Sequence, residues 1–287
     1  MMRGYVSMCS QLYRFLIYLV QKPKMHLENG MLIISIDVDV GNRKLGVINK
    51  GKNDENISSR MSEYKIGEIE EKALPLFVKI LNNFEIPATF AIRGQLSVVN
   101  GFIPMLLSYP VKHDIGAHGY YHREFTKLSR DEAERELNMI SEGFKKFGIR
   151  PRSFVFPKNS VAHLDLLEKH AYICYRGSGN FMKDRMLIEK KGKLYNIHPS
   201  LYLGKGTSFA LMKRILDVSI TKKLPFHVWF HLWNFGETVE TIQKIIRKVF
   251  IPFFSYAKRK ERDGLLSFET MLSAANKIEK FGIQRVI

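Results

Sequence analysis

The chain has 287 residues, of which 45% are hydrophobic and 25% are charged. These proportions are ordinary for a globular protein and exclude an extended disordered chain. The length allows one large domain or two small ones, with enough residues to bury a core. Cys9 and Cys174 are the only cysteines, which excludes a disulfide framework and fits a reducing compartment. We therefore expect a cytoplasmic location.

The formal net charge of +17 favours an anionic partner, such as nucleic acid, an acidic membrane surface or an acidic glycan. The basic residues are spread along the chain, with a denser cluster at Lys258–Arg262. Such a dispersed excess is more often typical of a solvated surface than of a binding site. No zinc-finger or RNA-binding signature accompanies the charge, so we expect no nucleic-acid partner. A nucleic-acid-binding role would instead show a steep salt dependence of binding.

The segment Leu12–Val20 is apolar, but Arg14 interrupts it and it is shorter than the roughly 20 residues that span a bilayer. A signal peptide is disfavoured because Gln21–Lys24 follows in place of small residues for cleavage. We interpret residues 1–30 as an N-terminal helical extension packed on a domain that covers residues 31–287. An amphipathic segment in peripheral contact with a membrane is the alternative.

Short apolar runs alternate with helical patterns along most of the chain. This alternation predicts an α/β fold with about seven parallel strands, arranged as a barrel or as an open sheet. No Gly-x-Gly-x-x-Gly turn follows the first strand, so a dinucleotide-binding fold has no support. The predicted strands are Leu32–Asp37, Ala88–Arg93, Lys112–Ala117, Ser153–Phe156, Tyr172–Tyr175, Leu194–Ile197 and Phe226–His231. The predicted helices are Ile66–Asn83, Phe102–Leu107, Arg130–Phe147, Leu164–Lys169, Phe209–Thr221, Val239–Ala257 and Phe268–Phe281.

Three local signals refine these elements. Ser129 is a candidate N-cap, and Glu132 three residues later completes a capping box. Pro252 should kink or split the helix predicted over Val239–Ala257. The long polar stretch Gly41–Arg60 directly follows the first strand, and a loop of this length is more often functional than idle. It is therefore a candidate lid or substrate-binding flap.

Asp37 and Asp39 end the first predicted strand, and residues two apart on a strand point to the same face. Burying two carboxylates is costly unless a cation compensates, so a bound metal would explain both. The alternative is a pair of turn-forming aspartates that cap the loop at Gly41. Two histidines later in the chain favour the metal site.

His118 and His122 are four residues apart, a spacing that brings both rings to one side of a helical turn. Two imidazoles at this spacing after a strand end are typical of a metal site. Asp114 is a nearby candidate to accept the N–H on the far side of a ligating ring. In parallel barrels the chemistry lies at the carboxyl ends of the strands, where the aspartates and histidines fall, and this favours the barrel.

His227, Trp229, His231 and Trp233 share one face of the last predicted strand. His231 is nearest the strand end, and its imidazole could deliver a proton to a leaving amine, since an unperturbed imidazole titrates near neutrality. A core histidine among aromatic residues is the alternative, and it suits His227 better. His198 also ends a strand and is a weaker candidate.

An arginine beside a catalytic carboxylate would hold it ionised and oriented. Arg150 and Arg152 precede the strand at Ser153, and Arg150 is expected at the surface. Arg93 and Arg176 also end predicted strands and compete for the same role.

Taken in order, these motifs resemble those of the polysaccharide deacetylases, carbohydrate esterase family 4. The resemblance extends from about Leu32 to Trp233, and the His-x-x-x-His motif in its glycine-rich context is its most specific part. The motifs that carry it are Ser35–Asp39, Ala88–Phe90, Asp114–His122, Arg152–Pro157 and Trp229–His231.

The resemblance implies a distorted (β/α) barrel and a metal-dependent hydrolase, usually with zinc, that removes N-acetyl or related acyl groups from amino sugars of a glycan or glycoconjugate. It implies that Asp37 is the general base and that Asp39, His118 and His122 are the metal ligands. The late motif implies that His231 is the general acid.

The sequence departs from the family pattern in two motifs. Val155 stands where the third motif usually carries an arginine, and Arg152 is the candidate catalytic arginine that replaces it. Tyr175–Gly177 occupies the region of the family's Asp- and Trp-containing fourth motif. The implied chemistry is metal-assisted amide hydrolysis, in which a backbone N–H near Tyr120 or Tyr121 helps to stabilise the oxyanion.

Two alternatives remain open. The Asp-x-Asp form of the first motif is similar to the branch that contains some peptidoglycan deacetylases and cyclic-amide hydrolases. A small closed pocket would favour a cyclic amide or imide substrate over a glycan. A non-catalytic glycan-binding domain is the third possibility, and absence of bound metal would favour it.

Overall fold

A computed structural model describes residues 25–39, 63–98, 101–177, 187–281 and 284–285. Strand β2 (Gly30–Val38) pairs with β3, β10 and β11 in the main sheet, and every one of its residues is buried. The unbroken apolar run Met31–Ile34 explains this, because a strand of a parallel sheet is covered on both faces. β2 therefore carries its polar residues, from Ser35 onward, into the interior of the protein.

The main sheet has ten strands in the order β7-β8-β6-β5-β4-β3-β2-β10-β9, with β11 pairing with β2 beside β3. All neighbouring strands are parallel except β7 and β8. The strands besides β2 are β3 (Thr89–Ile92), β4 (Asp114–Ala117), β5 (Ser153–Val155), β6 (Cys174–Arg176), β7 (Ile188–Lys191), β8 (Leu194–Ile197), β9 (Leu201–Tyr202), β10 (Pro225–Phe230) and β11 (Leu266–Glu269).

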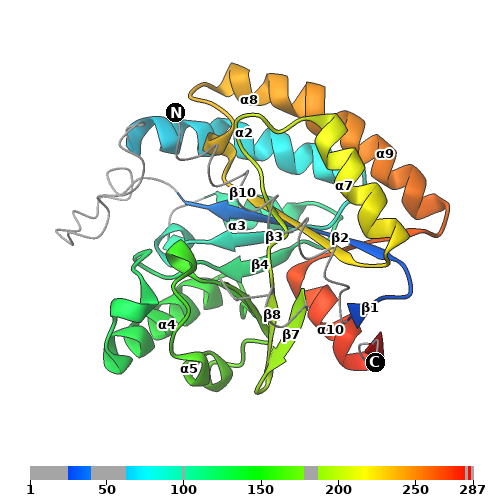
Figure 1. Cartoon of the computed structure of the whole chain (residues 1–287). Helices are drawn as coiled ribbons and strands as arrows, with labels where there is room; N and C mark the ends of the chain where they lie inside the picture. Colours follow the sequence, from blue (N-terminus) through cyan, green and yellow to red (C-terminus); the bar gives the residue numbers. More distant parts are fainter. Residues whose placement is uncertain (1–24, 40–62, 99–100, 178–186, 282–283, 286–287) are drawn as a thin grey trace.

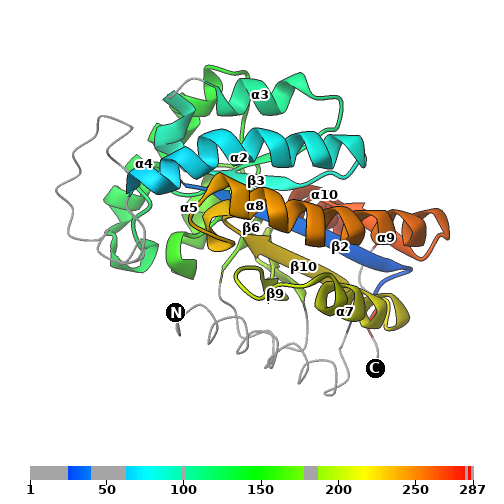
Figure 2. The same ribbon diagram turned by 90° about the horizontal axis from the view of Figure 1, so that it is seen from above.

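Helices cover the outer face of this curled sheet (Figure 1). In that view α2, α7, α8 and α9 lie above and to the right, α4 and α5 lie below, and α10 lies beside β1. Figure 2 shows α8 and α9 continuing in one direction alongside α2. The helices are α2 (Glu63–Asn83), α3 (Phe102–Ser108), α4 (Arg130–Lys145), α5 (Leu164–Lys169), α7 (Phe209–Thr221), α8 (Val239–Ile245), α9 (Ile251–Arg262) and α10 (Met271–Phe281).

This arrangement confirms the predicted α/β barrel-type fold as a half-barrel, in which β7 and β9 form the two edges of the sheet. The seven predicted strands and the helices up to Thr221 are all present, within a few residues of their predicted ends. The capping box is confirmed as well: the Ser129 hydroxyl accepts the Glu132 N–H, and the Glu132 carboxylate accepts the Ser129 N–H.

The C-terminal part confirms one prediction and corrects another. Residues 239–262 form two helices joined by a π-helical turn at Ile246–Phe250, in agreement with the split predicted from Pro252, which stands in the first turn of α9, where its missing N–H costs little. The helix predicted over Phe268–Phe281 was wrong at its start, because Leu266–Glu269 form β11 and the helix begins at Met271. A short apolar run such as 266–269 fits a strand and a buried helix equally well, so its periodicity could not decide.

Strands β7, β9 and β11 were not predicted, nor was the small sheet of β1 (Met25–His26) and β12 (Gln284–Arg285). β1 lies within residues 1–30, which we predicted to be a helical extension. The rest of that extension up to residue 24, and the stretch Gly41–Arg60, lie outside the described residues. Among the residues that the structure describes, no helix is both long and apolar enough to cross a membrane.

Candidate active site

The carboxyl ends of the central strands meet at one edge of the sheet, and the predicted site residues follow them. Asp37 and Asp39 end β2, His118 follows β4, and His231 follows β10. Together with His122 they border one pocket of about 160 Å³. The pocket is lined by Asp37, Asp39, His118, His122, Phe156, Lys158, Asn159, Arg176, Trp229, His231 and Trp233.

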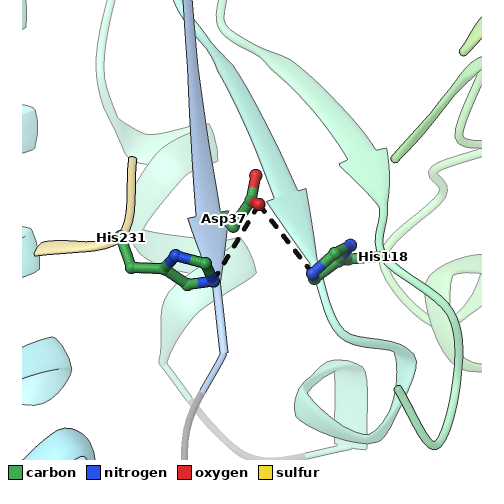
Figure 3. A group of neighbouring side chains, drawn as sticks. All are labelled: Asp37, His118 and His231. Atoms are coloured by element: carbon green, nitrogen blue, oxygen red, sulfur yellow. Dashed lines mark ion pairs between the residues drawn. The ribbon is translucent and has the colours of Figure 1, made fainter. Parts of the chain in front are cut away.

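Asp37 lies between His118 and His231 (Figure 3). Its Oδ2 accepts a hydrogen bond from Arg176 Nη2 at 2.5 Å and lies 3.9 Å from Nε2 of both His118 and His231. Burial works to raise the pKa of Asp37, but the charge of Arg176, followed by His118 and His231, outweighs it and lowers the pKa to about 2. Asp37 is therefore ionised at neutral pH although its side chain is only 2% exposed.

The arginine that contacts Asp37 is Arg176, at the end of β6, and not Arg152. Arg152 precedes β5, so it lies at the amino end of its strand, while the pocket lies at the carboxyl ends. Its carbonyl accepts the N–H groups of Ile173 and Cys174 there. The available signal was position along the strand: a side chain that ends a parallel strand can reach the site, and one that precedes the strand is a strand length away.

Asp39 is paired with a second arginine. Its Oδ1 lies 3.3 Å from Arg93 Nη1, and its Oδ2 lies 3.7 Å from His122 Nε2. Burial works to raise the pKa of Asp39, but His122 and then Arg93 lower it below its usual value. Arg93 also donates from Nη2 to the carbonyl of Tyr121 at 3.2 Å, so it ties Asp39 to the loop that carries the histidines.

The two loop histidines present their rings edge to face, with 4.8 Å between the ring centroids. His118 Nδ1 lies 2.9 Å from the carbonyl oxygen of Val155 and must donate to it, so Nε2 is the ring nitrogen that faces Asp37 and the pocket. Burial lowers the pKa of His122 to about 3, so its ring is neutral at physiological pH. His122 itself adopts a left-handed backbone conformation, with φ of 59°.

Asp114 does not support the histidines. It lies at the start of β4, away from the pocket, where its Oδ2 accepts hydrogen bonds from Thr89 and Ser153 at 2.9 and 2.7 Å. The backbone carbonyl of Val155 takes the role that we predicted for Asp114.

Glu136 of α4 is fully buried and contacts the loop that carries His118 and His122. Glu136 Oε2 accepts the backbone N–H groups of Tyr120 and Tyr121 at 2.9 and 3.3 Å, and its Oε1 accepts from Arg123 Nε at 2.7 Å. Both backbone N–H groups are thus engaged by a carboxylate, which contradicts the prediction that one of them binds an oxyanion. Glu136 was not predicted as a site residue, although a glutamate among the apolar positions of an amphipathic helix is a detectable signal.

His231 stands at the mouth of the pocket with its side chain 13% exposed. Its Nδ1 lies 3.2 Å from Asn234 Oδ1, an oxygen that can only accept, so Nδ1 carries a proton and Nε2 faces Asp37. Burial lowers the pKa of His231 even though Asp37 and Asp39 act in the opposite direction. Its ring lies 4.5 Å from that of Trp233, centroid to centroid.

Three buried polar side chains complete the surroundings. His227 and His198 lie deeper in the barrel and do not border the pocket, as we expected for His227. Glu70 of α2 is fully buried, and burial raises its pKa well above the usual value, with Asp39 and Asp37 adding to the effect. The sequence analysis missed Glu70, which shares the apolar face of α2 with Leu74 and Phe77.

The donor set fits a zinc-type cation. Neutral imidazole nitrogens and carboxylate oxygens are the ligands that zinc prefers with His and Asp side chains. Ligand atoms of Asp37, His118 and His231 all lie within 4.8 Å of one another, and the pair Asp39 and His122 borders the same pocket. Buried atoms without a hydrogen-bond partner in the described residues include Asp37 Oδ1 and His122 Nδ1.

Residues 64–171 match the family model described as polysaccharide deacetylase. The resemblance to the polysaccharide deacetylases is therefore confirmed. The matched region contains His118 and His122 of the pocket, whereas Asp37, Asp39 and His231 lie outside it. No curated protein matches the sequence.

Several solved structures share the fold. A protein from Mycobacterium smegmatis described as a polysaccharide deacetylase aligns with a TM-score of 0.66 and 13% identity, over 93% of this chain and 98% of that one. A second, from Pseudomonas aeruginosa PAO1, aligns with a TM-score of 0.60 and 12% identity, over 88% and 91%. PuuE allantoinase aligns with a TM-score of 0.59 and 13% identity, over 88% and 90%. At these identities the similarity concerns the fold alone.

Proposed function

We propose that this protein is a metal-dependent amide hydrolase that removes N-acetyl or related acyl groups from amino sugars of a glycan or glycoconjugate. One observation supports this most directly. An ionised carboxylate, Asp37, and an imidazole nitrogen, His231 Nε2, lie 3.9 Å apart at one pocket, next to a second carboxylate and two further imidazoles. A base, an acid and a set of metal ligands around one small volume are what amide hydrolysis requires.

Asp39, His118 and His122 are the residues that would hold the metal. Asp37 Oδ2 is already bound to the Arg176 cation, and a dication on the same oxygen would be repelled by it. Asp39 Oδ2, by contrast, faces His122 Nε2 at 3.7 Å. When bound, zinc would supply a water of lowered pKa and polarise the acyl carbonyl.

The remaining steps belong to the protein. Asp37 accepts a proton from the attacking water, and Arg176 keeps the carboxylate ionised and oriented until then. His231 donates a proton from Nε2 to the departing amine, because Asn234 fixes the other ring proton on Nδ1. The closeness of Asp37 and His231 allows the proton taken from water to return to the leaving group.

The pocket walls support a carbohydrate substrate. Trp229, Trp233 and Phe156 line it, and aromatic faces are the usual apolar surface of small-molecule sites. The indole N–H groups of Trp229 and Trp233 are buried without an acceptor among the described residues, so they can donate to oxygens of a ligand. Lys158 and Asn159 add polar groups at the rim, which suits an acidic glycan.

A cyclic amide is the second candidate substrate, and pocket size is the observation that favours it. The pocket holds about 160 Å³. A cavity of about 150 Å³ accommodates a single benzene ring. One small ring or one acyl group would therefore fill it, whereas a glycan would leave most of its sugars outside.

A cytoplasmic location with peripheral membrane contact is our proposal for where the protein acts. It is supported by the two cysteines in 287 residues and by the net charge of +17, which suits the anionic surface of a cytoplasmic leaflet.

The test is acetate release from a panel of N-acetylated glycans, together with ring opening of cyclic amides, each measured with and without a chelator. We expect chelator-sensitive acetate release. Asp37→Asn should abolish turnover and still bind zinc, whereas Asp39→Asn should lose zinc. If Asp37→Asn retains near-wild-type activity, the assignment of the general base is wrong. Ring opening without acetate release would establish the second candidate.

A further inference from the structure

Arg176 reaches Asp37 across the interior of the half-barrel. It ends β6, which is separated from β2 by β5, β4 and β3 in the sheet, and only the curl of the sheet brings the two strands face to face. Its side chain is 1% exposed. A guanidinium on a long flexible side chain has many conformations, so its position here must be fixed by its contacts.

Two contacts besides Asp37 fix this guanidinium. Arg176 Nη1 donates to Ser35 Oγ at 2.7 Å, and the guanidinium carbon lies 4.5 Å from the centre of the Trp229 ring. Ser35 precedes Asp37 by two residues on β2, so both side chains lie on the same face of the strand. Arg176 thus spans two successive inward positions of β2, with one nitrogen on each.

Ser35 is connected in turn to His227 of β10. Ser35 Oγ lies 2.8 Å from His227 Nε2, and His227 Nδ1 lies 3.3 Å from the carbonyl oxygen of His198. A carbonyl only accepts, so Nδ1 carries the ring proton and Nε2 is the acceptor. The Ser35 hydroxyl must then donate to Nε2, which turns its lone pairs toward Arg176.

The charge state of His227 agrees with this direction. Burial, and then the charge of Arg176, lowers the pKa of His227 to about 3, so the ring is neutral. The side chain is 1% exposed and lies below the pocket, so substrate cannot reach it directly. The direction of each hydrogen bond in this series is therefore defined. His227 donates to the His198 carbonyl, Ser35 donates to His227, and Arg176 donates to both Ser35 and Asp37.

We propose that Ser35 and His227 are positioning residues that hold the Arg176 guanidinium against Asp37 and so orient the general base. The geometric part of this inference stands alone, and its catalytic part rests on the proposed function. His227 orients the Ser35 hydroxyl, and this hydroxyl accepts from Nη1 of Arg176. Because the guanidinium is planar, fixing Nη1 also fixes the position of Nη2, which donates to the Asp37 carboxylate.

Two His227 variants separate this role from simple packing. Asn places its amide near the position of Nδ1, so His227→Asn can keep the bond to the His198 carbonyl but offers nothing to Ser35. Gln places its amide oxygen near the position of Nε2, so His227→Gln keeps the acceptor for Ser35. Ser35→Ala removes the same link from the other side and serves if His227→Asn does not fold.

The first measurement is the crystal structure of each variant, which needs no substrate. We expect Arg176 Nη2 to leave Asp37 in His227→Asn and in Ser35→Ala, and to stay in place in His227→Gln. Arg176 remaining bound to Asp37 in both His227→Asn and Ser35→Ala would overturn the proposal. This result is independent of whether the protein deacetylates any glycan.

The second measurement is steady-state kinetics on whichever substrate the panel identifies. Loss of a supporting contact around a reactive group costs roughly 10–100-fold, so kcat should fall by that factor in His227→Asn and Ser35→Ala with KM unchanged. His227→Gln should keep most of the activity. The double variant Ser35→Ala/His227→Asn should be no less active than either single variant, because both substitutions remove the same hydrogen bond between Ser35 and His227. Equal impairment of the two His227 variants would indicate packing alone. Absence of turnover in the wild type would refute the proposed function and leave the crystallographic test standing.

Discussion

At the scale of single residues, burial and charge pairing decide what each titratable group can do. Asp37 and Asp39 are both buried carboxylates, and neighbouring groups keep both pKa values below their usual range: Arg176 first for Asp37, and His122 followed by Arg93 for Asp39. Glu70 is equally buried, and its pKa is raised because no comparable cation offsets its burial. The same carboxyl group therefore has a lowered pKa at the strand end and a raised pKa on the adjacent helix.

His113 provides a test of this residue-scale argument away from the pocket. Its Nδ1 accepts the Ala88 N–H at 3.2 Å, and burial lowers its pKa from 6.5 to about 4. The unfolded chain then binds a proton more readily than the folded one. The contribution of His113 to the unfolding free energy is therefore fully present above pH 6.5. It falls as the pH drops and levels off below pH 4.

We expect His113→Asn, which keeps an oxygen acceptor near the position of Nδ1, to remove this dependence. The loss of unfolding free energy between pH 7 and pH 5 should be about 2 kcal/mol smaller in the variant than in the wild type. Urea unfolding of both proteins at the two pH values measures it. Equal losses in the two proteins would show that His113 is not the responsible group.

At the scale of elements, strands deliver the reactive groups and a helix fixes the loop between them. β2 and β10 run parallel and adjacent, so Asp37 and His231 emerge at the same edge. The loop Gly119–His122 has no regular structure of its own, and Gly119 and His122 both have positive φ angles. Glu136 of α4 holds it through two backbone N–H groups, so the position of α4 sets the position of the histidines.

Glu136→Gln should therefore weaken metal binding without touching a metal ligand. A glutamine offers one oxygen, which cannot serve the two backbone N–H groups and Arg123 as the carboxylate does. Loss of such a supporting contact typically lowers metal affinity about 10–100-fold. Titration with zinc measures the effect.

The matched control is Glu134→Gln, two residues earlier on the same helix. Glu134 forms an ion pair with Lys169 at the surface, where ion pairs contribute little. Zinc affinity should be unchanged in this variant. A similar loss in both variants would mean that the charge of α4, and not the anchoring of the loop, controls metal binding.

At the scale of the whole molecule, the curl of the sheet closes the site. The inward-facing polar residues of β2 lie opposite β6 across the half-barrel and next to β10. A metal bound in the pocket would therefore connect residues that follow several different strands. A ligand that binds only the folded state stabilises that state by mass action. Zinc should therefore stabilise the whole protein and not only its loops.

We expect metal-free protein to gain about 2.7 kcal/mol of unfolding free energy when free zinc is 100-fold above its dissociation constant. Thermal unfolding with and without zinc measures this as a rise in Tm. His118→Ala should abolish the rise, although its metal-free Tm should also be lower, because the variant removes a buried ring and its hydrogen bond to the Val155 carbonyl. A zinc-dependent rise that persists in His118→Ala would place the ion elsewhere.

Most of the strand–helix order, the buried strand β2 and five polar residues of the pocket could be predicted from the sequence, because periodicity and strand ends are local properties. The roles of Arg176 and Glu136 and the Ser35–His227 link could not be predicted, because these contacts join elements far apart in the chain. The third motif predicted that Arg152 contacts Asp37. The curl of the sheet instead brings Arg176 to Asp37. The short strand β11 was missed for a related reason, since pairing with β2 and not local pattern makes residues 266–269 a strand. Local sequence thus specified which chemical groups the site contains, and tertiary structure decided which of them meet.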